Sequence, residues 1–311
     1  MTNEIKNSGL ISVLPALLGL CCLVLIGGCQ KKLTSEVSVD DELLDRVQHE
    51  TFNYFWEGGE PISGGARERL HMDDIYPTHD KDIITSGGTG FGIMATLVGI
   101  ERGFISRQQG YERLLRLTNW LAEADRFHGA WPHWWMPDGT VQPFSQHDNG
   151  GDLVETSFLV QGLIAARQYF KNGSPEEQEL ARKMDELWRG VDWQWYTREE
   201  NVLYWHWSPQ YEWKMDFPVH GYNECLIMYI LAASSPTHPV DPAVYHEGFM
   251  KTEKSSARTS TTDFHRFYII MGFRTEWSVH CFGHIILIWD SIPVAFRTIT
   301  RIIGNSIKTM P

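Results

Sequence analysis

The stretch that decides the fold is residues 151–170, with the sequence GDLVETSFLVQGLIAARQYF. From Leu153 onward it is apolar at most positions, which predicts a helix that is buried on most of its surface. Asp152 supplies an acidic N-cap, and the Asn172-Gly173 pair that follows Phe170 is a typical helix end. We therefore expect a mostly buried helix over about residues 152–170.

Other helical patterns lie on both sides of this segment. Ser106 is the expected N-cap of one amphipathic helix, and Ser174-Pro175 is a strong start for another, because proline is favoured at the first helical position. Together these patterns predict an all-α fold of stacked helical hairpins rather than a sheet protein. The remaining expected helices are one that opens at residues 40–42 with Leu43, Leu44, Val47, Thr51 and Phe55 on one face, an apolar one over residues 91–103 after the glycine run 87–90, and one over about residues 222–233.

The composition excludes one class of function and points to another. The 311 residues hold 27 Lys and Arg against 39 Asp and Glu, a formal net charge of −12. Such an acidic chain lacks the basic footprint of nonspecific nucleic-acid binding, so no nucleic-acid partner is expected. Many of the 13 Trp residues lie in long loops that also carry His and Asp. Loops of that length and composition are expected to build a site.

The N-terminal residues 1–29 have the features of an export signal. Lys6 is followed by an apolar run over residues 10–26, which is too short and too glycine-rich for a membrane span. The run ends in Ile26-Gly27-Gly28-Cys29, which resembles a bacterial lipobox, although an ordinary signal peptide or a membrane anchor also fits. We expect acylation of Cys29 and a lipid-anchored protein of the bacterial cell envelope.

Four acidic positions are candidates for chemistry. Asp152 and Glu155 are three residues apart and share one helix face, a spacing that by itself favours a capping box over a catalytic pair. Glu224 opens an apolar segment, where a carboxylate needs hydrogen bonds to offset its burial. Asp148 lies in the turn-prone string HDNGG at residues 147–151. The residues alone leave structural and catalytic roles open for all of them.

Seven sequence motifs together match one family. They are EGGEP at 57–61, ARER at 66–69, GGTGFG at 87–92, RFHGAWPHW at 126–134, GDLVET at 151–156, LYWHWSP at 203–209 and GYNEC at 221–225. These motifs resemble the glycoamylase-like domain family, whose bacterial members include endo-β-1,2-glucanases of glycoside hydrolase family 144. The resemblance covers about residues 40–248 and implies an α/α toroid of six helical hairpins. The sequence is expected to encode only about half of that toroid in the correct reading frame.

The resemblance also implies roles for individual residues. Asp152, Glu155 and Glu224 match active-site acids of the family, which suggests hydrolysis of a β-glucan by general acid/base chemistry with inversion. Inversion needs two carboxyl groups roughly 6.5–9.5 Å apart. Because Asp152 and Glu155 are too close to form that pair, Glu224 is expected to supply one half of it. Which group is the acid and which the base stays open.

The glucan is expected to contact polar and aromatic side chains of the loops. Indole rings suit the stacking of pyranose faces, and any single Trp is more often part of a core, so about two of the loop Trp residues are expected to contact sugar. The substrate-binding set comprises Asp148, Trp131, His133, Trp134, Trp205 and Trp207. His147, Asp148 and Asp152 could gather around a cation, but no metal-binding spacing is present, so neither a metal nor a cofactor is expected.

The tail over residues 249–311 differs from the body. It holds eight Lys or Arg against four Asp or Glu, and ten Ile but only one Leu. Back-translation of residues 279–306 with free codon choice permits the aromatic, helix-like string GPLFWAHYSYLGFDSRGLSDDYANYWEQ in a shifted frame. We therefore expect residues 30–248 to be the N-terminal part of the catalytic domain and the tail to be out of frame. Sequencing the gene around the codons for Gly248 and Phe249 tests this expectation.

These patterns leave three hypotheses about the protein. The first is a β-glucan hydrolase, most similar to an endo-β-1,2-glucanase and truncated as the sequence stands. The second is a glucan-binding lipoprotein without catalysis, which would bind glucan and release no reducing sugar. The third is a pseudogene product.

The lipid anchor gives a direct test. Replacing Cys29 with Ser removes the thiol that would carry the acyl chains, so the protein should leave the membrane fraction for the soluble one. Fractionation of cells that produce each version, followed by immunoblotting, measures the change. Unchanged partitioning would contradict the lipobox interpretation.

Overall fold

The computed structural model describes residues 39–221 and 223–250. The expected signal sequence with Cys29 and nearly all of the expected tail lie outside these residues. The chain divides into two units, Met1–Arg46 and Val47–Pro311, and the description below concerns the second. No helix in the described part of the chain is both long and apolar enough to cross a bilayer.

The described residues are mostly helical, which confirms the all-α prediction. The strands are short, each two residues long, and they occur in the loops that connect the helices. In chain order the helices are α2 (Val39–Trp56), α3 (Ser86–Glu101), α4 (Arg107–Glu123), α5 (Leu153–Phe170), α6 (Pro175–Arg189) and α7 (Leu226–Ser234), with the 3₁₀ turn η1 (Trp195–Thr197) and the π-helix η2 (Val244–Phe249). The strands are β1 (Ile84–Thr85), β2 (Trp134–Trp135), β3 (Val141–Gln142), β4 (Gly151–Asp152) and β5 (His206–Trp207).

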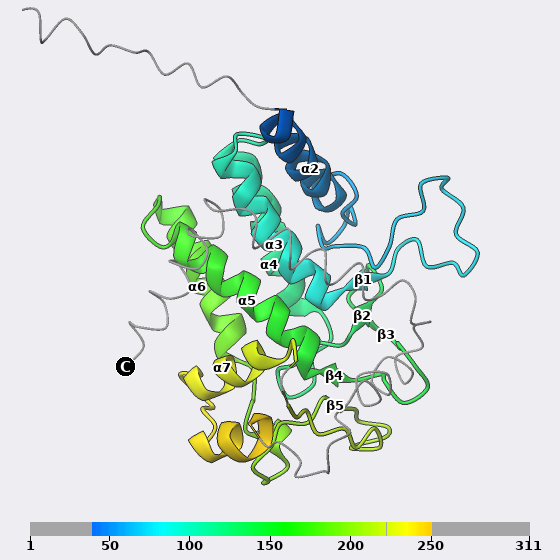
Figure 1. The fold of residues 1–311 in the computed structure, drawn as a ribbon, viewed down its shortest axis with the longest axis vertical. Helices are drawn as coiled ribbons and strands as arrows, with labels where there is room; N and C mark the ends of the chain where they lie inside the picture. The colour runs from blue at the N-terminus through cyan, green and yellow to red at the C-terminus, as the bar shows by residue number, and fades with distance from the viewer. Residues whose placement is uncertain (1–38, 222, 251–311) are drawn as a thin grey trace, which may run out of the picture. The chain divides into compact units, whose positions relative to one another are not determined.

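Helix α5 is the packing centre of the second unit. It contacts α3, α6 and α7, and Figure 1 shows it between α3 and α6. Most of its side chains are buried, from Leu153 at the start to Phe170 at the end, as the near-continuous apolar sequence predicts. Helices α4 and α6 are amphipathic and lie outside it, so the buried and amphipathic helices alternate as expected.

Two glycines let α3 and α5 approach closely. A Cβ on Gly90 would lie 2.2 Å from the backbone oxygen of Phe158, and a Cβ on Gly162 would lie 2.4 Å from the backbone oxygen of Gly90. No side chain larger than hydrogen fits at either position without moving the backbone. The glycine run 87–90 was expected to precede a helix, and instead it forms the first turns of α3, because these residues are the contact surface.

Both predicted capping signals are present. The Ser106 hydroxyl accepts a hydrogen bond from the backbone N–H of Gln109, and the Gln109 side chain accepts one from the Ser106 backbone N–H. Ser174 and Glu177 make the same reciprocal pair at α6, with Pro175 at the first helical position. Because these hydrogen bonds join residues three positions apart, the sequence predicts the start of both helices.

The first and last helices differ from their predictions. In the part of α2 that belongs to the second unit, Phe52 is buried and Thr51 is exposed. The Phe52 ring packs on Phe104 at 5.5 Å between centroids. Leu43 and Leu44 are exposed. Helix α7 begins at Leu226, four residues later than predicted. Asn223 is the reason: its Oδ1 accepts the N–H of Cys225 and its Nδ2 donates to the His220 carbonyl, which holds a turn in place of a helical one.

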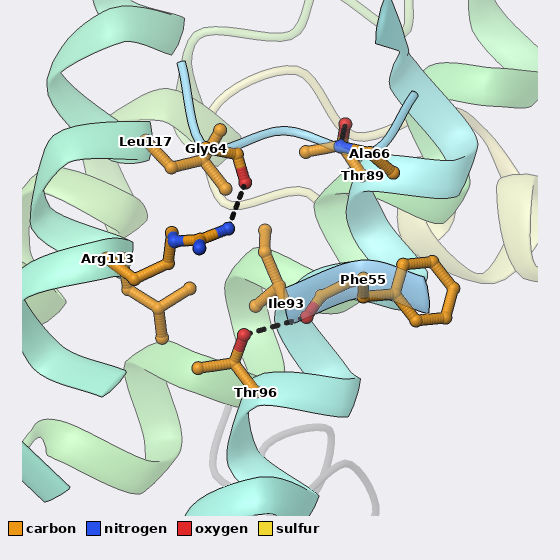
Figure 2. Close-up of a pocket in the computed structure, with 10 residues that line it drawn as sticks. Phe55, Gly64, Ala66, Thr89, Ile93, Thr96, Arg113 and Leu117 are labelled. Atoms are coloured by element: carbon orange, nitrogen blue, oxygen red, sulfur yellow. Dashed lines mark hydrogen bonds between the residues drawn. The ribbon is translucent and has the colours of Figure 1, made fainter. Parts of the chain in front are cut away.

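A small cavity lies where α4 meets the segment after α2. Figure 2 shows the Arg113 side chain reaching from α4 toward Gly64, whose carbonyl accepts a hydrogen bond at 3.5 Å. Arg113 also donates to the Trp56 carbonyl at 2.8 Å and stacks over the Trp56 ring. The cavity volume is about 10 Å³, which is room for a single water molecule and no sugar. This region is therefore structural.

The contact between α3 and α5 yields a stability prediction. In Gly90→Ala the new methyl group meets backbone of α5, and overpacking of this kind costs about 1–3 kcal/mol. That loss opposes the gain of about 1 kcal/mol that alanine brings to a helix. Denaturant unfolding of both chains should therefore show a lower unfolding free energy for Gly90→Ala.

Gly92→Ala on the same helix is the matched control. Its Cβ would meet side chains and no backbone: the Phe55 ring at 3.1 Å and the Ala66 Cβ at 3.9 Å. Gly90→Ala should be less stable than Gly92→Ala by at least about 1 kcal/mol. Equal stabilities would show that the close approach does not constrain the fold.

Candidate active site

Strand pairing brings three loops to the start of α5. Strand β4 pairs antiparallel with β5, so Gly151 lies opposite Trp207 and Asp152 lies opposite His206. The Asp152 N–H donates to the Trp131 carbonyl, and the Leu153 N–H donates to the Trp205 carbonyl, both at 2.8 Å. The segments 131–135 and 203–207 are thereby fixed against the first turn of the buried helix. This is where most of the predicted site residues meet.

Asp152 accepts hydrogen bonds on both carboxylate oxygens. Oδ1 accepts the backbone N–H of Glu155 at 2.9 Å, which makes Asp152 the N-cap of α5. Oδ2 lies 2.8 Å from Nδ1 of His133 and accepts the Trp205 indole N–H at 2.7 Å. The residue is fully buried. Buried beneath these three donors, the carboxylate offers no accessible surface to a ligand.

Glu155 does not complete the capping box that the spacing suggested. Its Oε2 accepts the backbone N–H of Gly87 at 2.9 Å, so the side chain reaches across to the first turn of α3. The N-terminus of a helix favours a negative charge. Gly87 has to be glycine here, because a Cβ would lie 2.1 Å from that same Oε2. The glycine run thus shapes the site as well as the packing.

The surroundings of Glu155 raise its pKa to about 7. Burial is the main cause, and the charges of Asp152 and Glu224 act in the same direction. The imidazolium of His133 and the Gly87 hydrogen bond oppose the rise. A carboxyl that changes protonation near neutral pH is suited to proton transfer.

His133 is the buried cation among these acids. Burial alone would lower its pKa, but the charges of Glu155, Asp152 and Asp148 and the hydrogen bond to Asp152 outweigh burial and raise the pKa to about 9. Its ring stacks on Phe144 at 4.2 Å between centroids. The sequence-based prediction gave His133 a sugar-binding role, whereas the structure places it nearly buried behind Asp152 and Phe144.

Glu224 lies two residues before α7 and stays exposed. Its pKa is raised because the neighbouring protein displaces part of its hydration shell. Its charge also raises the pKa of Glu155, so the two carboxyl groups are electrostatic neighbours although they are distant in sequence. The structure therefore brings together the three acids that the sequence singled out.

Asp148 forms a buried pair with His206. Its Oδ1 lies 3.1 Å from Nε2 of His206, and both side chains are almost completely inaccessible. That Nε2 accepts the Gly150 N–H at 3.2 Å, so it donates no hydrogen bond to Asp148. Asp148 was predicted to contact sugar, and its side chain lies beneath the surface here, so that role stays a prediction.

The predicted aromatic contacts divide into two groups. Trp131 and Trp205 are buried, and their indole N–H groups donate to the Leu121 carbonyl and to Asp152. Trp134 and Trp207 are partly exposed and so remain available to a ligand. Which of the loop Trp residues contact sugar stays a prediction.

Sequence reasoning missed further aromatic residues beside Trp207. Trp195 is 39% exposed, stacks on His128 at 3.7 Å between centroids, and meets Trp207 edge to face at 5.8 Å. Trp213 lies on the other side of Trp195 at 6.2 Å. These residues also lie in a Trp-rich loop, so the sequence contained the same indication for them. Which aromatic rings are exposed is decided by the fold.

One group in the described part of the chain has the composition of a metal site. His133, Asp148 and Asp152 offer ligand atoms that all lie within 4.8 Å of one another. Asp152 already accepts three hydrogen bonds, and Nδ1 of His133 is engaged by one of them. Of these three residues, Asp148 is the one whose carboxylate oxygens have no hydrogen-bond partner, so the group offers a cation few ligand atoms that are not already engaged. The absence of a metal stays a prediction.

Comparison with known proteins gives the chain its relatives. The Glycoamylase family model, described as "Putative glucoamylase", matches residues 216–282. An exo β-1,2-glucooligosaccharide sophorohydrolase of Parabacteroides distasonis is 45% identical over 227 residues, which are 71% of this chain and 30% of that protein. The family match runs past Gly248 into the segment that was expected to be out of frame.

Solved structures agree with the sequence matches. The endo-β-1,2-glucanase of Chitinophaga pinensis, in complex with sophorotriose and glucose, is 58% identical with a TM-score of 0.68, over 71% of this chain and 53% of that one. A β-1,2-glucanase of Parabacteroides distasonis is 44% identical with a TM-score of 0.65, over 70% of this chain and 31% of that one. The chain thus spans about half the length, or less, of these relatives. The resemblance carried by the motifs is confirmed: part of this chain matches the glycoamylase family model, and the chain is similar to β-1,2-glucan hydrolases.

Proposed function

We propose that this chain is a glycoside hydrolase that acts on a β-glucan, with a β-1,2-linked glucan as the substrate. The observation that carries the proposal is Glu155, a carboxyl fixed on the Gly87 N–H, with a pKa of about 7 and a second carboxyl, Glu224, as its electrostatic neighbour. Glycoside hydrolysis needs two carboxyl groups, one of them protonated. The relatives named as β-1,2-glucan hydrolases support the choice of substrate.

The roles of the two carboxyl groups follow from their exposure. Glu155 is held by a backbone N–H at the start of α3 and changes protonation near neutral pH, so it supports a proton-transfer role. Glu224 is exposed and stands free to meet substrate or water. An inverting mechanism needs two carboxyl groups far enough apart to admit a water molecule. Glu155 and Glu224 lie in different elements of the fold, so they suit this requirement better than the adjacent Asp152 and Glu155.

Aromatic side chains would hold the glucan beside these acids. Trp134 and Trp207 are the predicted sugar-binding residues with exposed ring surface, and Trp207 follows the His206 that pairs with Asp152 in the β4–β5 ladder. Stacking on an indole face orients a pyranose without hydrogen bonds. Acylation at Cys29 would place this activity at the bacterial cell envelope, where the substrate would be an external oligo- or polysaccharide.

Substitution of the two glutamates tests the catalytic proposal. Glu155→Gln and Glu224→Gln keep side-chain shape and remove the titratable group. Each should lower the rate of reducing-sugar release from β-1,2-glucan at least about a hundredfold, the low end for loss of general acid/base catalysis. The assay should use this chain and a version whose reading frame is restored after Gly248, because the truncation expected from the sequence predicts little turnover by the chain itself.

Glu179→Gln is the matched control. Glu179 lies on the exposed face of α6 and pairs with Arg182, so its loss should leave the rate unchanged. Near-normal rates for both active-site variants would overturn the assignment. Glucan binding without hydrolysis by the frame-restored protein would favour the binding-protein hypothesis instead.

A further inference from the structure

We propose that Asp152 is a positioning residue, which fixes the His133 ring beside Glu155, and that it is neither the acid nor the base of the reaction. The proposal rests on the proposed function, because it assigns a role within that site. It changes the sequence-based expectation, in which Asp152 and Glu155 had the same standing as active-site acids.

The first argument is that Asp152 has no capacity left for a substrate. Both of its oxygens accept hydrogen bonds, one from the Glu155 backbone and two from the rings of His133 and Trp205, at 2.7–2.9 Å. The carboxylate is completely buried. A general acid or base has to come within hydrogen-bond reach of the atom it protonates or deprotonates. Asp152 could do so only after breaking the cap of α5.

The second argument is that the His133 ring is fixed on several sides. Nδ1 contacts Asp152, one ring face stacks on Phe144, and Trp134 meets the ring edge to face at 5.7 Å between centroids. The His133 carbonyl accepts the backbone N–H of Ser86 at 3.1 Å, which ties it to the start of α3. Asp152 is the polar contact that sets the ring orientation.

The third argument is the balance of charge around that ring. His133 faces Asp152 at the β4–α5 junction, Glu155 on α5 and Asp148 from the preceding loop. Glu155 in turn faces His133, Asp152 and Glu224. One imidazolium therefore offsets several carboxyl groups. Its positive charge opposes the rise in the pKa of Glu155. Asp152 therefore acts on Glu155 in two ways, directly through its own charge and indirectly by holding the His133 ring.

The test measures protonation directly and needs no turnover. In the full chain with labelled His and Glu, nuclear magnetic resonance follows the His133 ring and the Glu155 carboxyl through a pH titration. Asp152→Asn retains an N-cap oxygen, since Asn caps helices as well as Asp, and it removes the charge. The His133 pKa should fall by at least about one pH unit, a tenfold weaker hold on the proton.

His133→Asn provides the second arm. Its amide can still donate to Asp152, but the positive charge is lost, so the Glu155 pKa should rise above about 7. Glu179→Gln should move neither titration. Unchanged titration of His133 in Asp152→Asn, or of Glu155 in His133→Asn, would overturn the proposal.

A kinetic arm separates this proposal from the proposed function. In an active, frame-restored protein, Asp152→Asn should regain at least about tenfold in rate when the pH is lowered enough to protonate His133 again. Loss of a true acid or base would not be recovered in this way, and an equal loss at every pH would refute the positioning role. If the frame-restored protein without substitutions hydrolyses no β-glucan while the titrations behave as stated, the proposed function fails and the positioning role of Asp152 stands.

Discussion

The close contact of α3 with α5 is the constraint on which the site depends. Gly90 and Gly162 bring the two backbones together, and Gly87 then presents its N–H to the Glu155 carboxylate. A bulkier residue at Gly90 or Gly162 would push the helices apart, and one at Gly87 would displace the Glu155 carboxylate from its position. The glycines of α3 and α5 therefore serve both the packing of the fold and the geometry of the site. Helix α5 has the composition of an ordinary core helix, and it also positions the site residues.

The electrostatics of the site follow from burial around a single cation. Three acids approach His133, and the protein supplies fixed donors to only some of them: Asp152 receives three and Glu155 receives one from backbone. Asp152, with most donors, is held in place by them, whereas Glu155, with a single backbone donor, has a pKa raised to about 7. Two carboxyl groups on one helix turn can thus have different functions, because their hydrogen-bond partners differ.

Local signals in the sequence predicted a good part of this structure. The caps at Ser106 and Ser174 and the buried α5 were readable because their determinants lie within a few residues of one another. The helical glycine run, the buried Phe52 and the late start of α7 were not, because tertiary contacts or a side-chain turn decide them. In the site, the spacing of Asp152 and Glu155 correctly suggested a cap, but only half of one. The partner of Glu155 is Gly87, 68 residues earlier in the chain, a contact that no local pattern reveals.

The most direct test of this account is a crystal structure of the chain with a β-1,2-glucan trisaccharide. The account predicts a glycosidic oxygen or its attacking water within about 2.6–3.2 Å of Glu155 or Glu224. It also predicts sugar rings against Trp134 or Trp207, and Asp152 still bonded to His133 and Trp205 beneath them. A sugar bonded directly to the Asp152 carboxylate, with His133 displaced, would contradict the account, as would a sugar bound away from the start of α5.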